Sequence, residues 1–283
     1  MLLWWPAVRT AITVLLNSIL QMENGITAWP TSHLEPAMDP VLAFVGNKIL
    51  SCAGQNDISY QYHLSNNTWS VYATAPVKFS TTVGITFEEK LYLIDGMGHS
   101  EIFDPVANSW STWEKPENIS GYGSCIVNWN NKFLFLGGWT YPRRVQTYDP
   151  VSGEWELIDS ELVPMDMKMS GCAMLPNGEV LIVGSMEGPY DRSVAIYNPE
   201  GNTWKKLDDA TYDRHGAVVV VLGSRVFAID GRGGNHVEEF DYNVYTWDSV
   251  SAGLITHREE GIGVMALPAE MFNLLPGACT GVE

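Results

Sequence analysis

Short apolar runs, each preceded by a polar turn and closed by glycine, recur along the chain. Residues 133–136 lead into Gly137-Gly138, and residues 180–183 lead into Gly184. Runs of this length bounded by glycine are typical of β-strands and are too short for helices. With their turns, the five copies span residues 47–54, 89–96, 131–138, 178–184 and 224–231.

An aromatic residue follows each apolar run, and a tryptophan lies seven positions after it. Tyr148 and Trp155 flank the turn Asp149-Pro150-Val151-Ser152-Gly153-Glu154. The other pairs are Tyr62 and Trp69, Phe103 and Trp110, Tyr197 and Trp204, and Phe240 and Trp247. The tryptophans are 41, 45, 49 and 43 residues apart, which indicates a repeat protein. With a strand of small residues before each run, every unit contains four antiparallel strands, which we call a, b, c and d.

These units resemble the kelch repeat, in which a diglycine closes strand b and a tyrosine and a tryptophan follow at fixed separation. The diglycine is complete only at Gly137-Gly138, whereas the aromatic pair is present in all five copies. The resemblance covers residues 41–267 and implies an all-β fold, a kelch-type β-propeller with four antiparallel strands per blade. We predict blades at about 41–75, 82–115, 123–158, 171–208 and 216–250.

The repeated aromatic and glycine positions are expected to be structural. We expect each tryptophan to fill the space between its strand d and the next blade. The residues assigned to this framework are Trp69, Trp110, Trp155, Trp204, Trp247, Tyr148, Tyr197, Gly137 and Gly138.

The two ends of the chain predict a sixth blade. Trp29 lies 40 residues before Trp69, so residues 16–29 are expected to supply strands c and d. Residues 261–277 are expected to supply strands a and b, which would close the ring and remove two sheet edges. Alternatively, residues 1–21 are a signal peptide, because they contain two apolar stretches, and the propeller occupies residues 22–283.

Four cysteines and two sequons bear on the compartment. Cys125 and Cys172 hold equivalent places on strand a of neighbouring blades, Cys52 lies on a strand b, and Cys279 is in the tail. Two disulfides are compatible with four cysteines, but we expect the three strand cysteines to be buried free thiols. Asn66 and Asn118 are candidate glycosylation sites and favour a secreted protein, with a cytoplasmic one as the alternative.

Charge and motif content exclude several functions. The chain has 33 acidic and 16 basic residues, a net charge of −17, which argues against nucleic acid or an anionic membrane surface as the partner. No stretch reaches the roughly 18 apolar residues of a membrane-spanning helix. Zinc spacings, phosphate-binding loops and nucleophile elbows are absent from the sequence, so we expect no catalytic residue, no metal site and no cofactor.

The kelch resemblance implies a protein-binding module. Kelch propellers commonly serve as substrate receptors of cullin-type ubiquitin ligases or as scaffolds, so the chain is either a stand-alone binding protein or a fragment of a ligase receptor. The alternative of a different class is a kelch-fold oxidase or sugar-modifying enzyme.

Arginine predicts which face of the ring binds. Because the strands of a blade alternate in direction, the a–b and c–d turns lie on one side of the ring, which we call the turn face. The b–c and d–a connections lie on the other side, which we call the loop face. Six of the seven arginines after Arg9 lie in loop-face connections. Beside aromatic residues they are suited to an acidic peptide or loop. The candidate partner-binding residues are Arg143, Arg144, Arg192, Arg232, Trp139, Tyr141, Tyr190 and His236. Arg214 and Arg258 are instead expected to make internal ion pairs.

Overall fold

The computed structural model describes residues 41–250, apart from 53–56, 64, 67, 116–118, 120, 159–161, 233 and 235. Within these residues, 20 strands form five four-stranded antiparallel sheets, each in chain order. The four-stranded propeller blade predicted from the repeat is therefore confirmed.

The blades follow one another along the chain. Blade 1 consists of β1 (Val41–Val45), β2 (Lys48–Cys52), β3 (Ile58–His63) and β4 (Thr68–Thr74). Blade 2 consists of β5 (Val83–Phe87), β6 (Lys90–Ile94), β7 (Ser100–Asp104) and β8 (Ser109–Thr112). Blade 3 consists of β9 (Ser124–Trp129), β10 (Lys132–Gly137), β11 (Val145–Tyr148) and β12 (Trp155–Ile158). Blade 4 consists of β13 (Gly171–Met174), β14 (Val180–Val183), β15 (Val194–Asn198) and β16 (Thr203–Lys206), with the short 3₁₀ helix η1 (Gly188–Tyr190) between β14 and β15. Blade 5 consists of β17 (Val218–Leu222), β18 (Arg225–Ile229), β19 (Val237–Asp241) and β20 (Thr246–Ser249).

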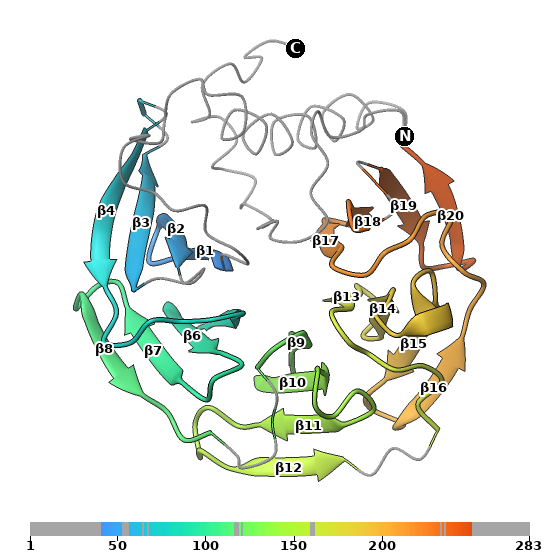
Figure 1. Cartoon of the computed structure of the whole chain (residues 1–283), viewed down its shortest axis with the longest axis horizontal. Coiled ribbons are helices and arrows are strands. Elements are labelled where there is room, and N and C mark those ends of the chain that lie inside the picture. The colour runs from blue at the N-terminus through green and yellow to red at the C-terminus, as the bar shows by residue number, and fades with distance from the viewer. Residues whose placement is uncertain are drawn as a thin grey trace.

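The five blades are arranged around a central axis, with the first strand of each blade innermost (Figure 1). Consecutive innermost strands, from β1 through β5, β9 and β13 to β17, contact one another. In Figure 1 the described blades form an arc that is open between blade 1 and blade 5. The structure thus describes five blades rather than the six we predicted, and the segments predicted to form the sixth, residues 16–29 and 261–277, lie outside the described residues.

Tight turns between strands a and b account for the regular spacing of the apolar runs. In blade 3, Trp129 of β9 pairs with Lys132 of β10, so that only two residues form the turn. These residues, Asn130 and Asn131, have φ angles of 51° and 61°. Two consecutive positive φ angles give the turn whose twist matches a β-hairpin, and asparagine adopts them more readily than most residues.

The turns between strands c and d depend on a single side chain. In blade 3 the carboxylate of Asp149 accepts hydrogen bonds from the backbone N–H groups of Val151 and Ser152, at 2.9 and 3.2 Å. Those two bonds hold the pKa of Asp149 below its ordinary value. Asn198 bonds the backbone of Glu200 and Gly201 in the same way in blade 4. The short polar side chain therefore replaces backbone pairing where the chain reverses.

The hydrophobic core lies between blades. Leu136, Val145 and Val127 of blade 3 form one cluster with Val180 and Tyr197 of blade 4. The repeat tryptophans of blades 2 to 5 pack toward the preceding blade, contrary to our expectation that they would face the next one. In each of these blades, the strand d tryptophan belongs to a hydrophobic cluster shared with the blade before it. These tryptophans are Trp110, Trp155, Trp204 and Trp247.

The diglycine that closes β10 is required by a close approach of the backbone. Gly137 has a φ of +66°, and a Cβ atom placed on it would lie 2.2 Å from the carbonyl oxygen of Met167. Gly138 donates its N–H to the same oxygen at 2.8 Å. The connection between β12 and β13 therefore rests directly on the end of β10, which leaves no room for a side chain.

Cys125 of β9 and Cys172 of β13 form a disulfide, with Cα atoms 6.0 Å apart. Our expectation of free thiols is wrong for this pair, because the equivalent strands of adjacent blades lie close enough to be linked. Cys52 is free and buried, as expected. Cys279 lies outside the described residues.

Candidate functional site

Trp139 lies in the connection between β10 and β11 and is the tryptophan among the loop-face candidates. Its side chain is 42% exposed. The ring stacks on Tyr122 with centroids 5.0 Å apart, and the backbone N–H of Trp139 donates to the carbonyl of Tyr122 at 2.9 Å. In the same connection, the Arg144 guanidinium lies 3.9 Å from the centroid of the Tyr141 ring. A cation and two accessible rings are thus fixed within six residues of chain.

Arg143 has a structural contact in addition to its predicted role. Its guanidinium pairs with Asp166 and donates to the carbonyl of Val163 at 3.2 Å. These contacts tie the β10–β11 connection to the β12–β13 connection. Arg143 therefore helps to shape the loop face, which makes it a poor choice for a test of binding alone.

The remaining candidates are distributed over blades 4 and 5. Arg192 and Arg232 are exposed. The His236 ring stacks on Tyr212, with centroids 3.6 Å apart and planes 10° apart. Tyr190 ends η1, and its side chain lies outside the described part of the chain. The structure therefore brings Trp139, Tyr141 and Arg144 together in one connection, while Arg192, Arg232 and His236 belong to neighbouring blades.

Arg214 makes the internal ion pair that we predicted. Its side chain and that of Glu238 are both 0% exposed, with Nη2 2.7 Å from the carboxylate. Its Nη1 donates to the carbonyls of Asp230 and His236, at 2.6 and 2.9 Å. The guanidinium, with four hydrogen bonds, joins the connection before β17 to both ends of the β18–β19 loop. Arg258 lies outside the described residues.

The sequence interpretation included Trp139 but missed the rest of a row of exposed apolar side chains on the loop face. Met97, Trp139 and Met186 each stand directly after the two residues that close strand b. They are 72%, 42% and 38% exposed. Arg232 occupies the same repeat position in blade 5. Aligning the repeats one position beyond the diglycine would have identified the row, because apolar residues at an exposed loop position indicate binding rather than packing.

Buried polar side chains hold this row in place. In blade 2, Asp95 is fully buried, and its Oδ1 accepts the backbone N–H groups of Met97, Gly98 and His99 at 2.9, 2.8 and 2.8 Å. In blade 4 the Ser185 hydroxyl, also fully buried, accepts the N–H of Glu187 at 3.3 Å. The exposed methionines are therefore carried by loops with fixed backbones, which lowers the entropy cost of binding.

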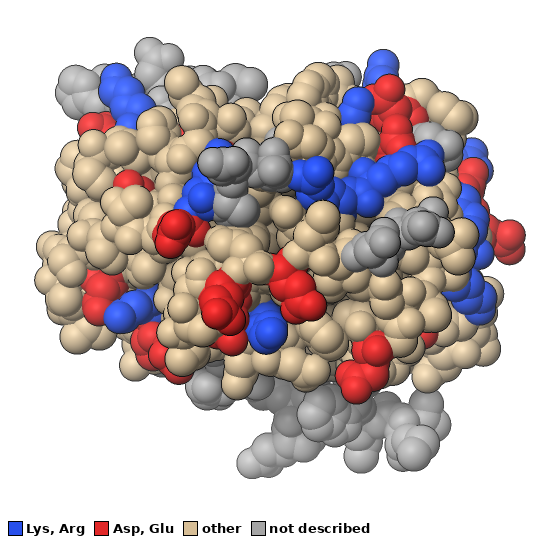
Figure 2. All heavy atoms as spheres, turned by 90° about the horizontal axis from the view of Figure 1, so that it is seen from below, with Lys and Arg blue, Asp and Glu red and all other residues tan. Residues whose placement is uncertain are grey.

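Lys168 adds a positive charge beside Trp139. Its ammonium lies 5.5 Å from the Trp139 ring centroid and 2.6 Å from the Glu187 carboxylate. In a side view of the ring, Lys and Arg side chains gather in a band across the upper half, and acidic side chains predominate below it (Figure 2). Positive charge is thus concentrated locally, although the net charge of the chain is −17.

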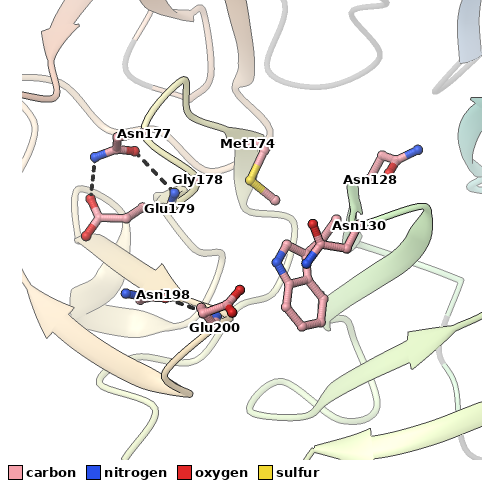
Figure 3. Close-up of a pocket in the computed structure, with 9 residues that line it drawn as sticks. Asn128, Asn130, Met174, Asn177, Gly178, Glu179, Asn198 and Glu200 are labelled. Carbon is pink, nitrogen blue, oxygen red and sulfur yellow. Dashed lines mark hydrogen bonds between the residues drawn. The ribbon is translucent and has the colours of Figure 1, made fainter.

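The turn face carries a pocket of about 440 Å³ between blades 3 and 4. It is lined by Asn128, Trp129, Asn130, Met174, Asn177, Gly178, Glu179, Asn198 and Glu200. The carboxylate of Glu200 points from the β15–β16 turn toward the blade 3 side of the pocket, whereas that of Glu179 lies against Asn177 (Figure 3). None of these residues was among our predicted site residues.

Neither a metal cluster nor a membrane span was found in the described residues. No group of three or more His, Cys, Asp and Glu side chains in the described ranges could hold a metal ion. No helix within residues 41–250, less the gaps given above, has the length and apolarity to cross a membrane.

Comparison with known proteins places these blades among kelch proteins. No family model matches the chain. It is 29% identical to kelch-like protein 23 of Mus musculus over 123 residues, which are 41% of this chain and 21% of that protein. It is 23% identical to beta-scruin of Limulus polyphemus over 218 residues, 68% of this chain and 23% of that protein. For kelch-like protein 15 of Danio rerio the identity is 23% over 209 residues, 60% of this chain and 34% of that protein.

The chain therefore matches only about a fifth to a third of the length of these relatives. The match to beta-scruin covers 68% of this chain, so it includes much of the region that forms the four-stranded blades. Sequence similarity and blade architecture agree: this chain carries kelch repeats folded as a β-propeller.

Proposed function

We propose that this protein is a non-catalytic binding module whose protein partner docks on the loop face. The observation that carries the proposal is the row formed by Met97, Trp139 and Met186, three exposed apolar side chains at one repeat position. Methionine and tryptophan are enriched in the cores of protein interfaces. Because Asp95 and Ser185 fix the adjoining backbones, the row is ready to bind without reorganisation.

The charges beside the row favour an acidic partner segment. Arg144 lies against Tyr141, Lys168 lies beside Trp139, and Arg192 is exposed in blade 4. Guanidinium groups bind carboxylates in paired, directional hydrogen bonds. We therefore propose a peptide or loop that combines aspartate or glutamate with apolar residues.

A comparison of matched variants tests the loop face. The Trp139→Ala, Met186→Ala double variant is expected to lose capture of the partner from a native extract while its melting temperature stays near that of the parent. The control is the Val106→Ala, Val151→Ala double variant, whose valines are 80% and 78% exposed on the turn face. Retained capture by the first variant together with loss by the second would place the partner on the other face.

The acidic nature of the partner is tested separately. Replacing Arg144 and Arg192 by alanine is expected to weaken capture, and capture by the parent should weaken as salt is added, because the contacts are ionic. The Lys90→Ala, Lys132→Ala variant on the turn face serves as the control for net charge. Binding that is unaffected by salt and by the arginine substitutions would contradict an acidic partner and indicate an apolar one.

Service as the substrate receptor of a cullin-type ubiquitin ligase is a narrower form of the same proposal. It draws support from the similarity to kelch-like proteins, of which this chain matches about a fifth to a third. Copurification of a cullin with the tagged chain, or with a longer form of the protein, would support it. Absence of a cullin from both preparations would contradict it.

We also propose that a sixth blade closes the ring. On the side of blade 1 that faces away from blade 2, Tyr62, Trp69 and Ile49 form a buried cluster. Phe227 and Ile229 of blade 5 are buried although they lie outside the cluster shared with blade 4. Deletion of residues 1–30 should then give an aggregating product. A chain that starts at Met22 and melts cooperatively would decide for a signal peptide instead.

A further inference from the structure

The pocket between blades 3 and 4 has an apolar base and an acceptor-rich rim. Met174 and Trp129 are partly buried and pack against the core cluster shared by these blades. The ionisable side chains that line the pocket are both carboxylates, Glu179 and Glu200, and no basic residue lines it. The pocket is therefore electronegative, and an indole ring and a thioether line it together with the carboxylates.

The two carboxylates differ in the hydrogen-bond and ion-pair partners that they already have. Oε2 of Glu179 accepts hydrogen bonds from Asn177 Nδ2 at 2.8 Å and from the Tyr245 hydroxyl at 3.0 Å. Lys205 lies 3.9 Å from the centroid of the Tyr245 ring, so the blade 5 side of Glu179 already has a cation nearby. Glu200 is exposed, and within the described residues no ion pair is formed by its carboxylate.

The backbone that carries Glu200 is fixed by its own turn. Asn198 Oδ1 accepts the N–H groups of Glu200 and Gly201 at 3.0 and 3.2 Å. The carboxylate consequently projects from a rigid position over the pocket (Figure 3). A negative group held in the open in a pocket that an aromatic ring also lines is suited to a cation that can both pair with the charge and stack on the ring.

We propose that this pocket binds an arginine side chain of a protein partner, on the face opposite to the docking surface proposed above. A guanidinium is planar, so it can stack on Trp129 while it donates hydrogen bonds to Glu200 and to the asparagine carbonyls of the rim. The overall charge of −17 attracts such a cation before contact is made. A neutral hydroxyl ligand such as a sugar would leave the exposed Glu200 charge unpaired.

The experiment uses the full chain and two small probes of equal shape. N-acetyl-arginine methylamide is titrated against the protein, and its uncharged isostere, N-acetyl-citrulline methylamide, is titrated in parallel. The readout is the indole N–H signal of Trp129 in a proton–nitrogen correlation spectrum, identified by its loss in a Trp129→Phe variant. We expect saturable displacement of this signal by the arginine probe and about tenfold weaker binding of the citrulline probe.

Substitution of the carboxylate completes the test. Glu200→Gln is expected to weaken the arginine probe about fivefold. Glu154→Gln, at an exposed position in the corresponding turn of blade 3 that does not line the pocket, should leave binding unchanged. Calorimetric titration of these two variants gives the same comparison without the Trp129 assignment.

Three results would overturn the proposal. They are equal binding of the arginine and citrulline probes, undiminished binding by Glu200→Gln, and displacement of the Trp129 signal by glucose but not by the arginine probe. Because the residues involved lie on the turn face, failure of this site leaves the loop-face proposal untouched, and the converse also holds.

Discussion

Trp155 of β12 stacks on Trp113, which follows β8 in the preceding blade, with ring centroids 5.8 Å apart and planes 13° apart. Its indole Nε1–H donates to the carbonyl of Glu114 at 2.9 Å. The repeat tryptophan therefore supplies both apolar contact and a hydrogen bond across one blade interface, and these two functions cannot be replaced by a smaller side chain.

Replacement of Trp155 by alanine should lower the free energy of unfolding by about 3 to 5 kcal/mol, because it removes the stacked ring from the blade interface. Urea unfolding followed by circular dichroism measures the loss. Trp139→Ala, at an exposed position on the loop face, is the matched control and should change stability little. Equal loss for the two variants would contradict the assignment of Trp155 to the blade interface.

Replacement of Arg214 by methionine should destabilise the protein by about 3 to 5 kcal/mol, because the buried Glu238 carboxylate would lose its partner. Lys206→Met, which removes an exposed pair with Asp209 at 3.5 Å, should cost less than about 1 kcal/mol.

A second substitution separates charge from packing at this site. If the cost comes from the unpaired carboxylate, the Arg214→Met, Glu238→Leu double variant should recover much of the stability in the same urea titration. A double variant as unstable as Arg214→Met alone would show instead that the guanidinium contacts to the Asp230 and His236 carbonyls dominate.

The disulfide between Cys125 and Cys172 should be recovered in peptide maps prepared without reductant. It links positions 47 residues apart. The Cys125→Ser, Cys172→Ser double variant should lose about 2 to 4 kcal/mol, because the open chain gains entropy when it unfolds. Cys52 is the internal control, since its buried thiol should be alkylated only after denaturation. Alkylation of Cys125 and Cys172 in unreduced, denatured protein would rule the disulfide out.

Alkaline pH should destabilise the fold through Cys52 and Tyr197. Burial raises the pKa of Cys52 from 9.0 to about 12 and that of Tyr197 from 10.0 to about 12. The native state therefore holds both protons over a range in which the unfolded chain releases them. This stabilisation is complete below pH 9 and is lost as the pH rises from 9 toward 12.

The Cys52→Ala variant isolates the contribution of the thiol. The urea midpoint of the parent should fall more steeply above pH 9 than that of the variant. Parallel curves for the two proteins would show that the thiol does not titrate on unfolding and that Tyr197 and its neighbours carry the whole effect.

Blade structure could be predicted from the sequence because its signals are local. Apolar runs closed by glycine and an aromatic residue seven positions before a tryptophan define strands and turns within about 40 residues. The turn at Asn130-Asn131 and the Asp149 cap involve neighbours in the chain, so residue identity alone indicates them.

The contacts of the loop face join residues that are distant in the chain, so local signals did not predict them. The number of arginines placed Arg143 with the binding residues, and only the structure shows that its guanidinium also pairs with Asp166. Of the exposed row, Trp139 was predicted, whereas Met97 and Met186 were missed, because apolar residues in a sequence are first assigned to the core.

The sequence by itself determined the repeat, the four strands of each blade and the residues that fill the core. Only the tertiary structure decided which neighbour each blade packs on, that Cys125 meets Cys172, and that Trp129 and Glu200 line one pocket. Strand and turn formation depends on residues close in the chain, whereas these contacts join residues 47 and 71 positions apart. Such residues meet only because the twist of each sheet sets the angle at which the next blade packs.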